Sequence, residues 1–580
     1  MSGMANIIKK QPLAAFLLAV LLVSFFIHSS NRRNHFQECD SVMVYHVIRE
    51  YPKSSLGWAS VAYGQGSFLS RETAERVLEI GIVKNLVGKY SPNISHDELV
   101  GKLSKINAVA FFRLGFQSLV ASIPLPYVLK TSFVMPFNSA YSFGSGFVYG
   151  LMTWGYVDYG DFMSRATFLT LLLFHASVML LYLICRRIGF SAKAAFLSAL
   201  LMLFSISMYS YGYHLGSTVW NYTSGFLWLF ILAVYWGKEK FWKRMSLATG
   251  ILIFFNYLIF FYWIALFLSH IYLRLRDSFS WQKARSEFFF FLKNQKFAIG
   301  SILLCVLAFY PPGQGNKGSA FLASDFYYIV LNFFSFFNQN TFFDLTQFIL
   351  AFSLLAYGVY IFVKKKKFRE GGIFLVIPLL LAVILFAFLV RVLEFVPSRH
   401  LLFLAPVAFI AVAFSLDDII RRIPRLICNY AVGALVLLII AGGVWALSVR
   451  MSDTRAVYDG LSLDSDIEDV IVQDCALDLS YRDWGRPVNI IPNDPKFFEV
   501  GREYVYLSQT KTFSEAVDQK WSTKGYIIRA ESSGDIQDTR NVYFAAYNPR
   551  KFLHTFPNSI FKARVHFLKI EKTAFVQDAN

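Results

Sequence analysis

The chain has 580 residues, of which 56% are hydrophobic and 16% are charged. This composition excludes an ordinary soluble globular protein, because several apolar runs are long enough to cross a hydrocarbon layer about 30 Å thick. The formal net charge of +18 does not indicate a nucleic-acid partner, since the excess of Lys and Arg lies between the apolar runs. The sequence predicts a polytopic α-helical membrane protein.

Basic clusters separate the apolar runs and give the predicted orientation. By the positive-inside rule they mark the cytoplasmic side of the membrane. The first apolar run, residues 12–27, is predicted to be a permanent transmembrane helix, because no convincing small-x-small cleavage site follows it. The N-terminus is therefore predicted to be cytoplasmic. The clusters are residues 9–10, 186–187, 238–244, 274–296, 364–367 and 421–425.

Residues 29–161 form a predicted first extracytoplasmic loop. Its start carries Glu38 and Asp40, two carboxylates one residue apart at the edge of the membrane. Such carboxylates are costly unless paired or hydrated, so they indicate a site. The alternative is that they only begin a helix, where acidic residues favour the positive end of the helix dipole. Later in the loop, residues 105–129 carry Arg113 and two prolines, which favours a helix in the membrane interface over a crossing.

After this loop, ten further apolar segments or half-segments bring the predicted total to about eleven membrane spans. Residues 247–273 are unusual, because basic residues flank both ends of the run. A single crossing would place the basic residues that follow this run on the outer side, against the positive-inside rule. Two short helices broken near Asn256 and Tyr257 would instead return the chain to the cytoplasmic side. The free backbone groups of a break need partners from protein or water, so a binding chamber is expected there. The remaining predicted spans are residues 163–185, 194–211, 226–236, 297–310, 345–363, 373–393, 400–416 and 426–447.

Residues 450–580 are predicted to form a separate extracytoplasmic domain that follows a membrane domain of residues 1–449. Alternating apolar and polar residues at 469–473 and 503–508, with turns at Gly525 and Gly534, predict a small α/β fold.

Cysteines are few. Only Cys39 and Cys475 lie in predicted extracytoplasmic segments, where a disulfide between them is chemically permitted but not required. Cys185, Cys305 and Cys428 lie in or near predicted spans.

The overall layout resembles the GT-C superfamily of polyprenyl-phosphate-dependent glycosyltransferases. It is most similar to the branch of bacterial protein mannosyltransferases and lipid A aminoarabinose transferases. Asp40, followed by Tyr45, falls where that family has an Asp-Glu pair and a Tyr. Arg165, the turn at 186–189 and residues 398–401 fall where it often has an Arg, an Arg-Arg-x-Gly turn and an Arg-Tyr-Leu. Two positions depart from the pattern, since Ser41 replaces the second acid and His400 replaces the Tyr.

The resemblance implies transfer of a sugar from a polyprenyl-phosphate donor to a lipid, glycan or protein acceptor at the outer face of the membrane, with inversion. Polyprenyl phosphate is a good leaving group, so the reaction chiefly needs a base at the acceptor hydroxyl. Asp40 is the expected base. Glu38 is expected to assist it, or to bind the acceptor or a metal.

Positive charge is expected to hold the donor phosphate, because the Arg fork matches phosphate oxygens. The candidates are Arg399, Arg165 and Arg113; the alternative for the last two is that they reach lipid headgroups. His400, His214 and Tyr45 are the candidates for contact with substrate, although a lone His such as His214 is more often a packed residue. No spacing predicts a metal site, and a divalent metal stays open.

Two other functions remain possible. A transporter or flippase for lipid-linked glycans would also have many helices, a broken segment and intramembrane polar residues. A glycan polymerase or ligase would place its catalytic loop late in the chain, as the loop 310–343 with Lys317 and Asp325 would allow. The donor sugar, the acceptor and the oligomeric state stay open.

Overall fold

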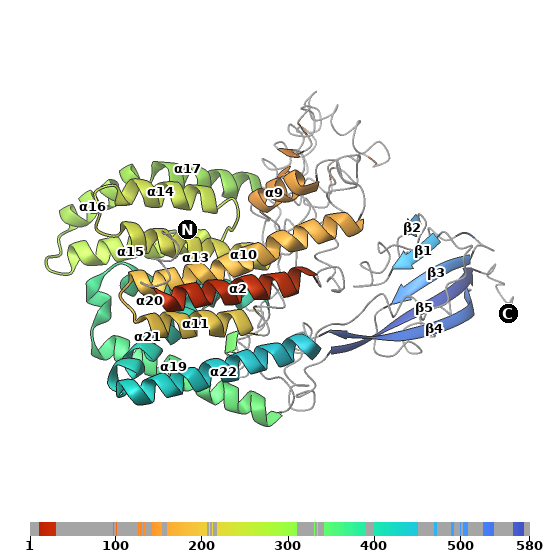
Figure 1. Cartoon of the computed structure of the whole chain (residues 1–580). Coiled ribbons are helices and arrows are strands. Elements are labelled where there is room, and N and C mark those ends of the chain that lie inside the picture. Colours follow the sequence, from red (N-terminus) through yellow and green to blue (C-terminus); the bar gives the residue numbers. More distant parts are fainter. Residues whose placement is uncertain are drawn as a thin grey trace, which may run out of the picture.

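The structure is a computed structural model. It describes residues 11–30, 95, 97, 100, 126, 128–129, 132–133, 142–153, 159–205, 208, 212, 217–309, 330, 333–334, 341–389, 399–449, 469–472, 489–491, 499, 503–508, 526–538 and 561–572. In the described part of the chain, the elements of regular secondary structure before residue 450 are helices, and those after it are strands. Figure 1 shows most of the longer helices lying side by side, with the strands beyond one end of the bundle.

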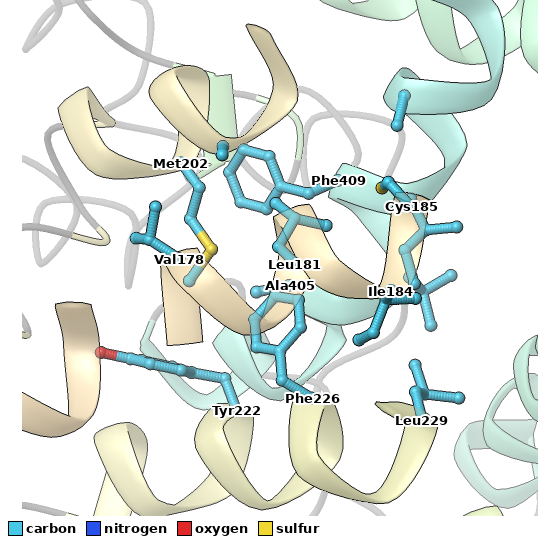
Figure 2. Close-up of a cluster of buried hydrophobic side chains, with 14 of the residues drawn as sticks. Val178, Leu181, Ile184, Cys185, Met202, Tyr222, Phe226, Leu229, Ala405 and Phe409 are labelled. Carbon is cyan, nitrogen blue, oxygen red and sulfur yellow. The ribbon is translucent and has the colours of Figure 1, made fainter. Parts of the chain in front are cut away.

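Six helices form the centre of the bundle. α10 packs against α2, α11 and α13, and α11 also packs against α21 and α22. Their long apolar runs favour helices because every backbone polar group is then bonded within its own segment. The contact between α10, α13 and α21 is filled by large buried side chains (Figure 2), which include Leu181, Phe226 and Phe409. The bounds are α2 Pro12–Ser30, α10 Tyr159–Arg187, α11 Ala192–Phe204, α13 Ser217–Tyr235, α21 Ala405–Arg422 and α22 Arg425–Val449.

The predicted break near Asn256 is confirmed. α14 (Phe241–Leu252) ends and α15 (Ile259–Leu275) begins on either side of a turn. The buried Asn256 side chain bonds on both sides, since its Nδ2 donates to the Asn221 carbonyl at 2.9 Å and its Oδ1 accepts from the Leu258 N–H at 2.9 Å. One polar side chain therefore satisfies part of the backbone that the break exposes.

The remaining helices surround this centre. α14 packs against α13 and α17, α15 packs against α16 and α20, and α19 packs against α21. α16 and α17 meet at a bend of 72°. The bounds are α9 Phe143–Thr153, α16 Trp281–Asn294, α17 Lys296–Leu304, η3 Cys305–Phe309, α19 Thr341–Lys364, η4 Lys367–Glu370, α20 Ile373–Leu389 and η5 Arg399–Leu404.

Four described helices are long and apolar enough to cross a membrane, and the bent pair α16–α17 would be a fifth. They contain residues 12–29, 164–187, 345–364 and 402–422. Five shorter apolar helices are also present in the described part of the chain. The protein is thus a helical membrane protein, while the number of about eleven spans stays a prediction.

Several helix bounds differ from the predicted spans; α13 begins at Ser217, ahead of the predicted 226. The span predicted at 194–211 is wrong at its end, because α11 stops at Phe204 and Ser205 is extended. A Ser- and Tyr-rich sequence follows there, and such residues favour helix ends. The predicted span 400–416 begins as the 3₁₀-helix η5, which passes directly into α21.

The strands form one mixed sheet in the order β2-β1-β3-β5-β4. β1 pairs parallel with β2 and β3, and β5 pairs antiparallel with β3 and β4. The alternating runs near 469 and 503 coincide with β1 and β3. The predicted turn at Gly534 is wrong, because Gly534 lies inside β4 and pairs with Val565. The bounds are β1 Asp469–Val472, β2 Asn489–Ile491, β3 Glu503–Ser508, β4 Tyr526–Asp538 and β5 Phe561–Lys572.

Candidate functional site

Most of the predicted site residues lie outside the described residues. These are Glu38, Asp40, Tyr45, Arg113 and His214. For Arg399 and His400 the structure describes the backbone, which begins η5. Arg165 lies in α10 and its side chain is exposed.

The basic segments gather at one end of the bundle, which we call the basic end. Lys365, which follows α19, and Arg422 of α21 both bind Asp418, and Arg421 donates to the Gly189 carbonyl at 2.9 Å. Arg276 after α15 donates to the Arg369 carbonyl at 3.2 Å. The other end of the same helices is called the opposite end.

α2 finishes at the opposite end, beside the start of α10. The rings of Phe25 and Phe168 lie 5.1 Å apart, and those of His28 and His175 lie 5.8 Å apart. Arg165 is one helical turn before Phe168. The last residue of α2 precedes Glu38 and Asp40 by only eight and ten positions in the sequence, and both lie outside the described residues.

η5 brings Arg399 and His400 to the same end. It packs against α13, and the Tyr262 hydroxyl of α15 donates to the Phe403 carbonyl at 3.4 Å. Gly225 of α13 allows this close approach, because an added Cβ there would lie 2.6 Å from the Tyr262 hydroxyl. η5, which begins with Arg399 and His400, therefore packs beside α13 and α15.

A group of buried polar side chains at the opposite end was missed by sequence reasoning. His175 Nε2 lies 3.1 Å from Ser24 Oγ, which lies 3.4 Å from His28 Nδ1, and His175 Nδ1 lies 2.7 Å from the Leu171 carbonyl. Both histidines are buried. The signal that marks them is a histidine within an apolar run, because intramembrane ionisable residues are often functional.

Hydroxyl groups continue this polar region. Ser177 Oγ of α10 lies 2.8 Å from Thr223 Oγ1 of α13. The hydroxyls of Thr167, Ser205 and Tyr222 are buried and have no hydrogen-bond partner within the part of the chain that the structure describes. Burying a hydroxyl without a partner costs about 1–3 kcal/mol. Such groups can donate hydrogen bonds to water, to a bound sugar or to phosphate oxygens.

α9, which belongs to the predicted first loop, docks on the helix break. The Gly144 N–H donates to the Phe254 carbonyl at 2.7 Å, and Trp220 Nε1 donates to the Tyr149 hydroxyl at 3.0 Å. The ring of Trp220 stacks on that of Phe255 at 5.5 Å. The break is thus covered by aromatic side chains at the opposite end of the bundle.

At the basic end, the turn at residues 186–189, together with Ser191, is hydrogen-bonded to α21. Asp417 Oδ1 of α21 accepts from the Ser191 N–H at 2.7 Å, and its Oδ2 lies 2.8 Å from Arg421 Nε. Gly189 has a φ of 93°, which favours glycine. These bonds give the turn a structural role far from the opposite end.

The described residues contain no group of three or more His, Cys, Asp or Glu side chains that could hold a metal ion. Cys185, Cys305 and Cys428 are free and buried. Cys39 and Cys475 lie outside the described residues, so their pairing stays open.

The comparisons with protein-family models and with curated proteins found no match for this chain.

Proposed function

We propose that the protein is a membrane glycosyltransferase that moves a sugar from a polyprenyl-phosphate donor to a lipid, glycan or protein acceptor of the cell envelope. The reaction would take place at the opposite end of the bundle. In this proposal the basic end faces the cytoplasm of a bacterium, about eleven helices cross the inner membrane, and residues 450–580 form an extracytoplasmic domain.

One observation supports the proposal: the end of α2, the start of α10 with Arg165, and the η5 backbone that begins with Arg399 and His400 lie toward the same end of the bundle. The end of α2 leads toward Asp40 and lies beside the turn of α10 that carries Arg165. η5, which begins with Arg399 and His400, packs on α13 near the helix break. Thr167, Ser205 and Tyr222 carry buried hydroxyls that have no partner among the described residues, and a polar ligand would supply hydrogen bonds to them.

The chemistry assigns a role to each residue. Asp40 takes the proton from the acceptor hydroxyl, and Glu38 assists it or holds the acceptor. Arg399, Arg165 and Arg113 hold the donor phosphate, and the released polyprenyl phosphate carries the negative charge away with it. His400, His214 and Tyr45 contact the sugars. Any divalent metal would be held by carboxylates of the segment that contains Glu38 and Asp40.

The test is a titration of the purified protein with a short polyprenyl phosphate. Arg399→Lys keeps the charge but loses the fork, so affinity should fall by about 1–3 kcal/mol, and Arg399→Ala should cost more. Arg425→Ala, at the exposed start of α22 at the basic end, is the matched control and should leave affinity unchanged. Equal affinity in all four proteins would overturn the assignment of the phosphate site.

A flippase for lipid-linked glycans is the second candidate, because the helix break and the buried hydroxyls also suit a translocation path. The two functions differ in product. A transferase in detergent forms a new glycosidic bond and releases polyprenyl phosphate, whereas a flippase leaves the donor intact and needs two membrane faces. Mass spectrometry of a labelled donor after incubation with the purified protein separates them. The polymerase or ligase alternative rests on residues 310–343, nearly all of which lie outside the described residues.

A further inference from the structure

α16 turns away from the helix that follows it. It is separated from α17 by Gln295 and bends from it by 72°. The buried Gln295 side chain holds the bend, since its Nε2 donates to the Trp242 carbonyl at 3.1 Å and its Oε1 accepts from Trp263 Nε1 at 3.2 Å. Figure 1 shows α16 at the end of the bundle farthest from the strands.

One face of α16 is held against the bundle. Phe291 is fully buried, and its ring lies 5.6 Å from that of Trp242 and 5.0 Å from that of Phe267. On the same face, Glu287 Oε2 lies 2.9 Å from Nε2 of the buried His270. α16 is therefore a packed element with a defined outward surface.

That outward surface is divided lengthwise into two flanks. Trp281, Phe288 and Leu292 recur at helical spacing on one flank, and Trp281 and Phe288 are 81% and 41% exposed. Gln282, Ser286 and Lys293 recur on the other, which is bordered by the rings of Phe289 and Phe290, 55% and 40% exposed. A helix with an apolar flank beside a polar one is typical of segments that lie in the boundary between lipid headgroups and acyl chains.

The charge around α16 is positive. Within residues 238–244 and 274–296 together, Lys and Arg outnumber Asp and Glu by ten to three. Trp242 of α14 contacts Phe290 and Phe291, and the next two residues, Lys243 and Arg244, are exposed, with Arg244 over the ring of Tyr235. Arg285 lies over the ring of Phe289 at 5.8 Å. The guanidinium is thus positioned beside an exposed apolar ring.

We propose that α16 lies in the membrane interface at the basic end and that Lys283, Arg285 and Lys293 bind the headgroups of anionic phospholipids. The apolar flank enters the acyl region, and the basic side chains reach the phosphates above it. This surface is separate from the proposed transfer site, which lies at the opposite end.

Native mass spectrometry of the full chain, titrated with phosphatidylglycerol or phosphatidylcholine, tests the lipid class. The triple variant Lys283→Gln, Arg285→Gln, Lys293→Gln should bind phosphatidylglycerol at least about tenfold more weakly, because each basic residue near the surface contributes to anionic-lipid affinity. The matched control Lys364→Gln, Lys366→Gln, Arg425→Gln removes the same charge from exposed positions elsewhere at the basic end. It should change that affinity less than about twofold. An equal loss in both variants would show unspecific attraction and overturn the proposal.

Deuterium exchange of the unmodified protein in lipid nanodiscs provides a second readout that needs no variant. Backbone amides of residues 281–294 should exchange more slowly in discs that contain phosphatidylglycerol than in discs of phosphatidylcholine alone. Equal exchange in the two lipids would contradict the proposal. If α16 were instead the first half of a broken span, exchange would be slow in both lipids.

Discussion

At the basic end, Asp417 and Asp418 pair with Arg421 and Arg422 of their own helix, and Asp418 also pairs with Lys365 after α19. At the opposite end, Thr167, Ser205 and Tyr222 bury neutral hydroxyls that have no partner among the described residues. Both ends place polar atoms inside a helical membrane protein. The charges at the basic end neutralise one another and join helices, while the hydroxyls at the opposite end keep donors available. In the proposed function, the basic end stabilises the bundle and the opposite end binds the substrates.

The bonds of Asp418 illustrate the structural role. Its carboxylate accepts from Tyr357 at 2.7 Å, from Lys365 at 2.6 Å and from Arg422 at 2.7 Å. These partners come from α19, from the residue that follows it, and from α21, so one carboxylate joins two helices. The carboxylate is buried while the cations are partly exposed, which limits the cost of desolvation.

The largest expected effect separates catalysis from stability. Asp40→Asn keeps the size of the side chain and removes its basicity, so turnover should fall by at least about a hundredfold, with donor affinity nearly unchanged. Thermal stability should stay the same. The measurement is the initial rate of transfer with a short polyprenyl-phosphate sugar.

Glu38→Gln is the matched control for Asp40→Asn. Near-normal turnover in Asp40→Asn together with inactive Glu38→Gln would reverse the roles of the two carboxylates. Activity in both variants would mean that this segment only begins a helix.

A smaller effect is expected at the basic end. Asp418→Asn removes charge-assisted bonds to Lys365 and Arg422, so the free energy of unfolding should fall by about 2 kcal/mol, within the range for bonds to charged groups. The specific rate of the folded fraction should not change, because these bonds lie far from the opposite end. Thermal unfolding in detergent gives the first quantity and an assay of the soluble fraction gives the second.

Glu370→Gln is the control for Asp418→Asn, because Glu370 is half exposed and pairs with Lys367 in the same basic segment. The free energy of unfolding of Glu370→Gln should stay within about 0.5 kcal/mol of that of the unmodified protein. If the specific rate of folded Asp418→Asn fell together with its free energy of unfolding, the basic end would also affect transfer, and the distinction between a stabilising end and a reactive end would be wrong.

Local patterns allowed some of this structure to be predicted. Asn256 interrupts an apolar run with basic residues at both ends, and this pattern placed the helix break correctly. Alternation at 469–472 and 503–508 marked β1 and β3. The turn predicted at Gly534 failed because long strand pairing with β5 overrides the local preference of glycine.

Contacts between distant parts of the sequence could not be predicted in this way. Ser24 and His175 are 151 positions apart, and Ser191 and Asp417 are 226 apart. Neither pair has a local signature, since only the packing of α2 on α10 and of α11 on α21 brings them together. The acidic segment that carries Asp40 lies outside the described residues, so its role rests on the resemblance and on the position of α2.

The smallest expected effect concerns Tyr222, and it has opposite signs for stability and binding. The buried hydroxyl lacks a described partner, so Tyr222→Phe removes a polar group that is costly to bury and should raise the free energy of unfolding by up to about 1 kcal/mol. If the hydroxyl binds the donor, the same change should weaken donor affinity by about 0.5–1.5 kcal/mol. Thermal unfolding with and without polyprenyl-phosphate sugar measures both quantities on one sample.

Thr223→Val serves as the control for Tyr222→Phe on the next residue of α13. The Thr223 hydroxyl already meets Ser177 at 2.8 Å, so its loss should lower stability by about 0.6 kcal/mol, the mean for hydrogen bonds between membrane helices. Donor affinity should not change, because this hydroxyl is engaged within the bundle. A destabilised Tyr222→Phe with unchanged donor affinity would show that its hydroxyl has a structural partner, and the opposite end would then resemble the basic end in holding helices together.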